Sequence, residues 1–194
     1  VGRATELSRL EGIFSACTGD SEARAVIVLG PAGAGKSRLR RELVEQIQRR
    51  GARATILSGH ADAIGQSSPF GPIADAIRDA AGIHEAEPLE VRRQKLTARL
   101  RRHLDGERLA RVATFLGELI RAPFPDDDNA ELRAARQNAQ LMGDATQAAW
   151  EDWLTAEAHA GPVVLILEDL HWADAATVQM IDATLRNLRD LPLM

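Results

Sequence analysis

The sequence predicts an α/β fold in which a parallel sheet lies between two layers of helices, and three observations point to it. Residues 25–29 and 163–167 are short, continuous apolar runs, as buried parallel strands require. A glycine-rich octapeptide follows the first run directly, at the position of a strand-to-helix turn. Apolar residues recur at helical spacing through most of residues 69–160. We therefore expect one domain, residues 1–194, with a helical insertion at about 69–160 between its second and third strands.

The first part of the chain contains a helix, a strand, a second helix and a weaker strand. Thr5 is the predicted N-cap of a helix over residues 5–17, and residues 25–29 form the first strand. Residues 52–58 are a weaker strand candidate, because their apolar and polar residues alternate without a clean polar face. The helix after the octapeptide carries a regular apolar face made by Leu39, Leu43 and Ile47.

The insertion is expected to contain four helices, and one more helix follows the third strand. Pro72 opens the first, and leucines within residues 89–104 and 109–119 mark the next two. A long fourth helix runs toward residue 159 with a break expected at Gly143. Asp174 is the predicted N-cap of the last helix.

The octapeptide Gly30 to Ser37 matches the phosphate-binding pattern G-x-x-x-x-G-K-[ST]. In such a loop, backbone N–H groups surround a phosphate and the glycines permit close approach, while the next helix directs its positive dipole end at the anion. Lys36 would reach the β- and γ-phosphates, and the Ser37 hydroxyl would bind Mg²⁺. The alternative is a glycine-rich turn that caps an ordinary helix. The residues expected to contact a nucleotide are Pro31, Ala32, Gly33, Ala34, Gly35, Lys36, Ser37 and, unless it belongs to a solvated helix face, Arg38.

Two acids, Glu168 and Asp169, directly follow the last predicted strand. Carboxylates at the C-terminal edge of a parallel strand are the expected partners of a phosphate loop. Because side chains alternate along a strand, the two should point apart and take different roles. We predict Glu168, with Ser37, as the metal ligand and Asp169 as the residue that orients the attacking water, and the reverse order stays open. Lys36 and both acids are thus the candidate catalytic residues, the alternative for the acids being a solvated strand end.

The amino-acid composition excludes several classes of binding partner. The net charge of −4 and the pI of about 5.8 argue against nucleic acid or an anionic membrane as a direct partner. The single cysteine, Cys17, excludes an internal disulfide, and no apolar run is as long as a membrane span, so a cytoplasmic location fits best. No histidine stands at ligand spacing from another histidine or cysteine, so zinc has no support. The chain begins without Met and stops just after a helix, so we expect a C-terminally truncated piece with at least one further strand beyond Met194.

The phosphate loop, the opening Val1-Gly2-Arg3 and the run from Val163 to Asp174 (VVLILEDLHWAD) together resemble the AAA-related ATPase module of STAND-type P-loop NTPases. Such modules occur in large LuxR-type transcription regulators and in bacterial kinase or cyclase fusion proteins. The resemblance implies a three-layer P-loop sandwich that binds ATP or ADP with Mg²⁺ and acts as a slowly hydrolysing regulatory switch. It also implies attached effector domains in the same polypeptide, and self-association.

The resemblance also implies that Gly2 and Arg3 lie near the base and ribose of the nucleotide. A glutamate often follows this arginine in the family, whereas this chain has Ala4 there. His171 could sense the γ-phosphate, or His171 and Trp172 could simply pack the turn before the last helix.

Two other functions remain open at this point. One is a scaffold that holds a nucleotide without turnover. The other is a small-molecule kinase, whose arginine-bearing lid would draw on Arg92, Arg93, Arg99, Arg101 and Arg102, although their spacing suits a solvated helix better. Trp150 and Trp153 are expected to be core or domain-interface anchors rather than platforms for a base.

Overall fold

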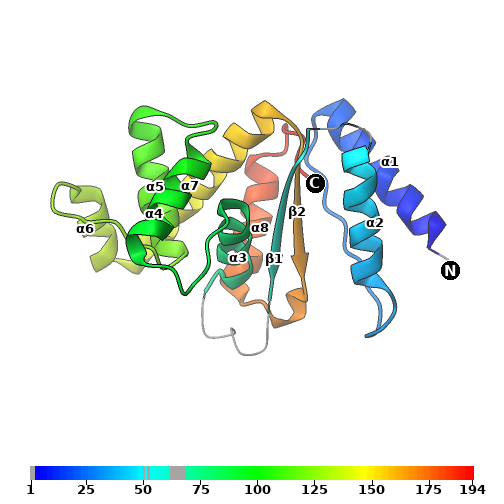
Figure 1. Ribbon diagram of the computed structural model, residues 1–194, viewed down its shortest axis with the longest axis horizontal. Coiled ribbons are helices and arrows are strands. Elements are labelled where there is room, and N and C mark those ends of the chain that lie inside the picture. Colours follow the sequence, from blue (N-terminus) through cyan, green and yellow to red (C-terminus); the bar gives the residue numbers. More distant parts are fainter. Residues whose placement is uncertain (1–2, 50, 52, 62–68) are drawn as a thin grey trace.

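A computed structural model describes residues 3–49, 51, 53–61 and 69–194. In it, helices pack against both faces of a short parallel sheet, and the larger helical group extends to one side (Figure 1). Gly2, one of the residues expected near the base, lies outside the described residues, as do part of the link after the second helix and the segment 62–68.

The sheet consists of β1 (Thr55–His60) and β2 (Val163–Glu168) within the described residues. The two strands are parallel, with Thr55 opposite Val163 at one end and His60 opposite Glu168 at the other. This pairing confirms the predicted strands near 52–58 and 163–167, with β1 shifted toward the C-terminus by two to three residues. The carboxyl ends of both strands therefore meet at one edge of the sheet, which is where polar ligands bind in parallel sheets.

The predicted strand at residues 25–29 is wrong as a sheet strand. Its side chains are exposed, with Ile27 at 80% and Leu29 at 86%, and no backbone hydrogen bond joins these five residues to β1 or β2 in the described structure. A strand exists only where a neighbour satisfies its backbone groups, so an apolar run alone does not make one.

The segment just before this run does have a neighbour. Arg24 N–H donates to Leu193 O at 2.8 Å, while Leu165 N–H donates to Met194 O at 2.8 Å. The last two residues of the chain therefore lie between β2 and the segment that leads to residues 25–29. Backbone hydrogen bonds thus join the chain end to Arg24 on one side and to Leu165 on the other. Among the described residues, this pairing does not extend to residues 26–29.

One face of the sheet is covered by α1 (Ala4–Asp20) and α2 (Lys36–Arg49). Val164 of β2 packs there in a small core whose other buried members are Leu10, Phe14, Leu39, Leu43 and Ile47. The apolar face predicted for the second helix is thus confirmed. Thr5 is not the N-cap of the first helix, since Arg3 precedes its first residue and Thr5 lies in the first turn.

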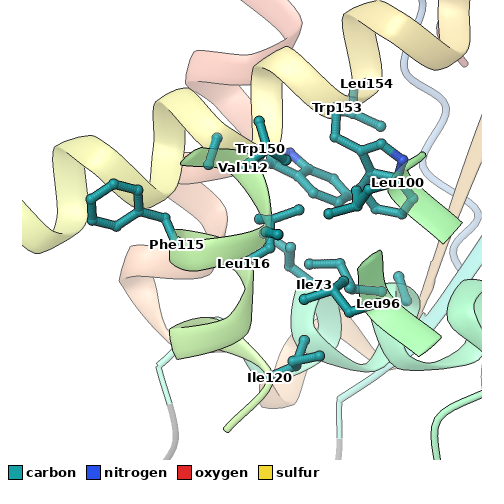
Figure 2. Packing of buried hydrophobic residues seen from close by; sticks show 14 of the residues in the cluster. Ile73, Leu96, Leu100, Val112, Phe115, Leu116, Ile120, Trp150, Trp153 and Leu154 are labelled. Carbon is teal, nitrogen blue, oxygen red and sulfur yellow. The ribbon is translucent and has the colours of Figure 1, made fainter. Parts of the chain in front are cut away.

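The remaining helices belong to a larger core on the other side of the sheet. They are α3 (Gly71–Ala81), α4 (Leu89–Leu100), α5 (Gly106–Leu119), α6 (Ala130–Gln137), α7 (Ala139–Ala160) and α8 (Ala175–Asn187), together with the short 3-10 helix η2 (Leu170–Trp172). Figure 2 shows Trp150 and Trp153 of α7 against side chains of α4 and α5. The two indole rings are edge to face at 5.6 Å, and both side chains are fully buried, so their predicted role as core anchors is confirmed.

The helix break expected at Gly143 occurs earlier instead. Asn138 has extended dihedral angles and its side chain accepts hydrogen bonds from the N–H groups of Gln140 and Leu141, so it ends α6 and caps α7. Gly143 lies inside α7. A capping side chain satisfies the unpaired N–H groups of a helix start, whereas a single helical glycine only weakens the helix.

Glycine at position 59 allows α3 to approach β1 closely. A Cβ at this position would lie 1.9 Å from the carbonyl oxygen of Pro72. Pro72 is at the start of α3, so this contact sets the distance between the helix and the carboxyl end of β1.

Candidate functional site

The phosphate loop lies between the exposed segment 25–29 and the N-terminus of α2. Gly33 and Gly35 have φ angles of +76° and +82°, which side-chain-bearing residues rarely adopt. Lys36 is the first residue of α2, and its Nζ donates to Gly30 O at 2.8 Å and to Pro31 O at 3.1 Å. The lysine is therefore folded back over the loop and held by carbonyl oxygens of the loop itself.

This loop fits an anionic ligand. The N–H groups in the first turn of α2 have no acceptor within the helix and carry the positive end of its dipole. An anion placed there would also reach the Lys36 ammonium, whose present partners are exposed backbone carbonyls. No group of three or more acidic, histidine or cysteine side chains that could cage a metal occurs among the described residues.

Arg3 and Arg38, the two arginines expected near the nucleotide, are placed differently. Arg3 lies directly before α1, and its Nε would be 3.7 Å from a Cβ built on Gly35, so it is next to the loop. Arg38 pairs with Glu42 at 2.7 Å one turn further along α2, and its side chain is 73% exposed. In this structure Arg38 lies on an exposed face of α2, and a contact between Arg38 and a phosphate stays a prediction.

Glu168 is the last residue of β2, and its side chain is directed toward α2. It shares a face of the strand with Val164, which packs against α2, because alternate residues of a strand point the same way. Its Oε2 lies 3.1 Å from Nη1 of Arg40 on α2. The carboxyl end of β2 is therefore joined to the helix that begins at the phosphate loop.

Asp169 leaves the strand with φ +54° and ψ +37°, in the left-handed region. Its Oδ2 is 3.8 Å from Nδ1 of His60, the last residue of β1. Glu168 and Asp169 therefore have separate cationic or titratable neighbours. Neither Arg40 nor His60 was expected here from the sequence, although His60 could have been found from its place opposite Glu168 once the strand register is known.

A cavity of about 450 Å³ opens at the carboxyl ends of the two strands. Its lining comes from the strand ends through His60 and Glu168, from α2 through Arg40, and from α3 through Asp75 and Arg78. The residues of the phosphate loop, 30–37, are not part of its lining. The candidate site therefore has two parts, the loop and the acid-lined cavity, and α2 connects them. In Figure 1 the N-terminus of α2 and the ends of both strand arrows lie at the same, lower edge of the molecule.

Asp174 is the N-cap of α8, as predicted. Its Oδ1 accepts from Thr177 N–H at 2.9 Å, and its Oδ2 accepts from Phe70 N–H at 3.1 Å and from the Thr177 hydroxyl. Burial opposes ionisation, but these hydrogen bonds outweigh it and hold the pKa of the Asp174 carboxyl below its ordinary value. Asp174 therefore ties the start of α8 to the residue before α3.

His171 and Trp172 lie in η2 with their rings 4.9 Å apart. Both are exposed, so they pack on each other at the surface of the turn and not in the core.

Among the arginines considered for a kinase lid, Arg99 is buried and makes two hydrogen bonds to Glu157 of α7, at 2.6 and 2.8 Å. A guanidinium held in the core cannot belong to a mobile lid.

A family model matches the chain over its whole given length. The family model for the AAA ATPase domain matches residues 1–194, and the chain belongs to this family. It is thus an AAA-type P-loop ATPase module, a class defined by nucleotide binding. Comparisons with curated proteins and with solved structures gave no match. None of the helices in the described ranges is long and apolar enough to cross a membrane.

Proposed function

We propose that the chain binds ATP with Mg²⁺, hydrolyses it slowly and serves as a regulatory switch for domains attached to it in the same polypeptide. The main support is one relationship: the acid that ends β2 is directed toward the helix whose N-terminus forms the phosphate loop, through the 3.1 Å contact between Glu168 and Arg40. This brings an anion-binding loop and a carboxylate to the same helix, which is the arrangement that a metal–nucleotide complex needs.

In this proposal each residue has a separate task. The backbone N–H groups of the loop and the Lys36 ammonium bind the phosphates, and the Ser37 hydroxyl and Glu168 hold Mg²⁺. The metal neutralises charge on the phosphate oxygens when it is bound. Asp169, whose Oδ2 lies 3.8 Å from Nδ1 of His60, orients the attacking water. Arg3, next to Gly35, contacts the sugar or base side of the nucleotide together with Gly2.

The fold proposed for this function is the three-layer sandwich, with α1 and α2 on one face of the sheet and the larger helical group on the other (Figure 1).

Nucleotide binding is tested with the two lysines of the chain, Lys36 and Lys95. A titration with a fluorescent ATP analogue should show binding by the wild type and its loss in Lys36→Ala. Lys95→Ala is the matched control, because Lys95 bonds to Gly82 O and Glu87 away from the loop, and its affinity should equal that of the wild type. Full affinity in Lys36→Ala would refute the proposal.

Hydrolysis is tested separately from binding, which distinguishes a switch from a scaffold that only holds a nucleotide. At saturating Mg²⁺, Glu168→Gln and Asp169→Asn should still bind ATP and should lose phosphate release. A wild-type protein that binds ATP but releases no phosphate above the level of these variants would favour the scaffold.

A further inference from the structure

Glu168 has a cationic partner on a neighbouring element, Arg40 of α2. Nη1 of Arg40 lies 3.1 Å from Oε2 of Glu168, and the two side chains are 37% and 29% exposed. The pair is therefore partly shielded from water, more so than the pair between Arg38 and Glu42 on the same helix. Arg40 binds the very carboxylate to which the proposed function assigns a metal.

Arg40 lies one helical turn beyond the proposed metal-binding hydroxyl. It stands three residues after Ser37 and four after Lys36, so its side chain is a neighbour of each of them on the surface of α2. One turn of helix is about 5.4 Å along the axis. A carboxylate bound to Arg40 is thus drawn along α2 away from the phosphate loop, while one directed at Ser37 is drawn toward it.

We propose that Arg40 competes with Mg²⁺ for Glu168 and so acts as a latch that is closed when the nucleotide site is empty. The inference rests on the proposed function, because it requires a metal–nucleotide complex at the loop. The ion pair must be broken, or its oxygen shared, before Glu168 can serve the metal. The guanidinium charge also opposes a second cation beside it. Both effects have the same sign: Arg40 weakens metal binding.

The cavity provides a place for the released guanidinium. Arg40 lines it together with Asp79 and Glu85, two carboxylates from α3 and the segment after it. Its volume of about 450 Å³ can hold an arginine side chain with water. When the Arg40 guanidinium leaves Glu168 and turns into this cavity, Asp79 and Glu85 can provide negative charge in place of Glu168. The latch therefore has two arrangements, and a bound metal can shift the balance between them.

The test is a Mg²⁺ titration followed by fluorescent ATP binding, with EDTA as the metal-free reference. In Arg40→Ala the Mg²⁺ concentration at half-saturation should fall by about two- to fivefold, the amount expected for a partly exposed ion pair. Affinity in EDTA should stay within twofold of the wild type. Arg40→Lys should fall between the two, because an ammonium keeps the charge but lacks the planar fork of the guanidinium.

Two controls connect the effect to Glu168. Arg41→Ala removes the next, exposed arginine of α2 and should leave the Mg²⁺ requirement unchanged. In a Glu168→Gln background, adding Arg40→Ala should lower the Mg²⁺ requirement by clearly less than in the wild type, since the latch has lost its anion and only the direct repulsion between the guanidinium and the metal remains. An equal shift in that background would show a general charge effect of α2 and would overturn the latch.

The outcomes also separate this inference from the function on which it rests. A wild type that binds no nucleotide would overturn both. Normal ATP binding with an unchanged or raised Mg²⁺ requirement in Arg40→Ala would overturn the latch and leave the proposed function intact.

Discussion

Glu157 of α7 bridges the helical group and the sheet, because its carboxylate binds Arg99 of α4 on one side and Thr55 of β1 on the other. Arg99 donates to both carboxylate oxygens, and the Thr55 hydroxyl donates to Oε2 at 2.9 Å. Trp153 Nε1 donates to Oε1 at 2.9 Å, and the Arg99 guanidinium lies 5.4 Å from the Trp153 ring. Glu157 is 1% exposed, so a charge buried in the core is satisfied entirely by these neighbours.

Removing this carboxylate should strongly destabilise the protein. Glu157→Ala leaves the Arg99 guanidinium buried without a counter-charge, and we expect the free energy of unfolding to fall by about 3–5 kcal/mol. Urea denaturation measures it. The double variant Arg99→Met with Glu157→Leu removes both charges and should recover most of the loss. A single variant that costs no more than the double would contradict this account.

The same carboxylate should make stability depend on acid pH. Burial opposes its charge, but the bonds from Arg99 and Thr55 and the nearby His103 outweigh burial and lower the pKa of Glu157. An unfolded glutamate titrates near about 4.3. The stabilisation is therefore complete above that pH and is lost as the pH falls through the lower pKa of the folded state.

Urea midpoints measured from pH 7 down to pH 3 check this dependence. The wild type should lose stability below about pH 4, and Glu157→Gln, already less stable at pH 7, should lose less over the same range. Parallel curves for the two proteins would assign the acid sensitivity to other carboxylates, such as Asp174, whose pKa is also lowered.

Gly59→Ala should destabilise the junction between β1 and α3. Its Cβ would lie 1.9 Å from Pro72 O, a backbone atom that cannot turn away, so we expect a loss of about 1–3 kcal/mol. Gly143→Ala is the matched control, because a Cβ there meets nothing within 4 Å and the residue lies inside α7. That substitution should stabilise by about 0.5–1 kcal/mol, measured by urea denaturation. Equal effects would show that the contact with Pro72 is unimportant.

Asp174→Ala should cost about 1–2 kcal/mol, because it removes the cap of α8 and the acceptor for Phe70 N–H. Asp105 is a suitable comparison, since it occupies the N-cap position of α5 without a side-chain capping bond. Asp105→Ala should change stability by less than about 0.5 kcal/mol in the same thermal or urea unfolding experiment. Similar losses in both variants would argue against the capping role.

Local patterns predicted the elements that depend on near neighbours. The apolar face of α2 and the cap at Asp174 follow from residues within one or two turns, and both appear in the structure. The left-handed angles at Gly33 and Gly35 likewise belong to a short loop of defined type. The break predicted near Gly143 is wrong, because the Asn138 side chain caps α7 at its start, whereas a single glycine inside a helix does not end it.

Contacts between distant segments could not be predicted in this way. Residues 25–29 have the composition of a buried strand, yet their exposure depends on which backbone lies beside them. Arg40 stands among other arginines of α2 in the sequence, and only the packing of β2 against α2 makes it the partner of Glu168.

The sequence by itself determined that this is an AAA-type ATPase module with a phosphate-loop motif at a helix start, because such a loop is a continuous stretch whose geometry follows from its own glycines and the helix that succeeds it. The tertiary structure decided which basic side chain meets each acid, Arg40 for Glu168 and His60 for Asp169, because strand register and helix docking bring together residues that are far apart along the chain.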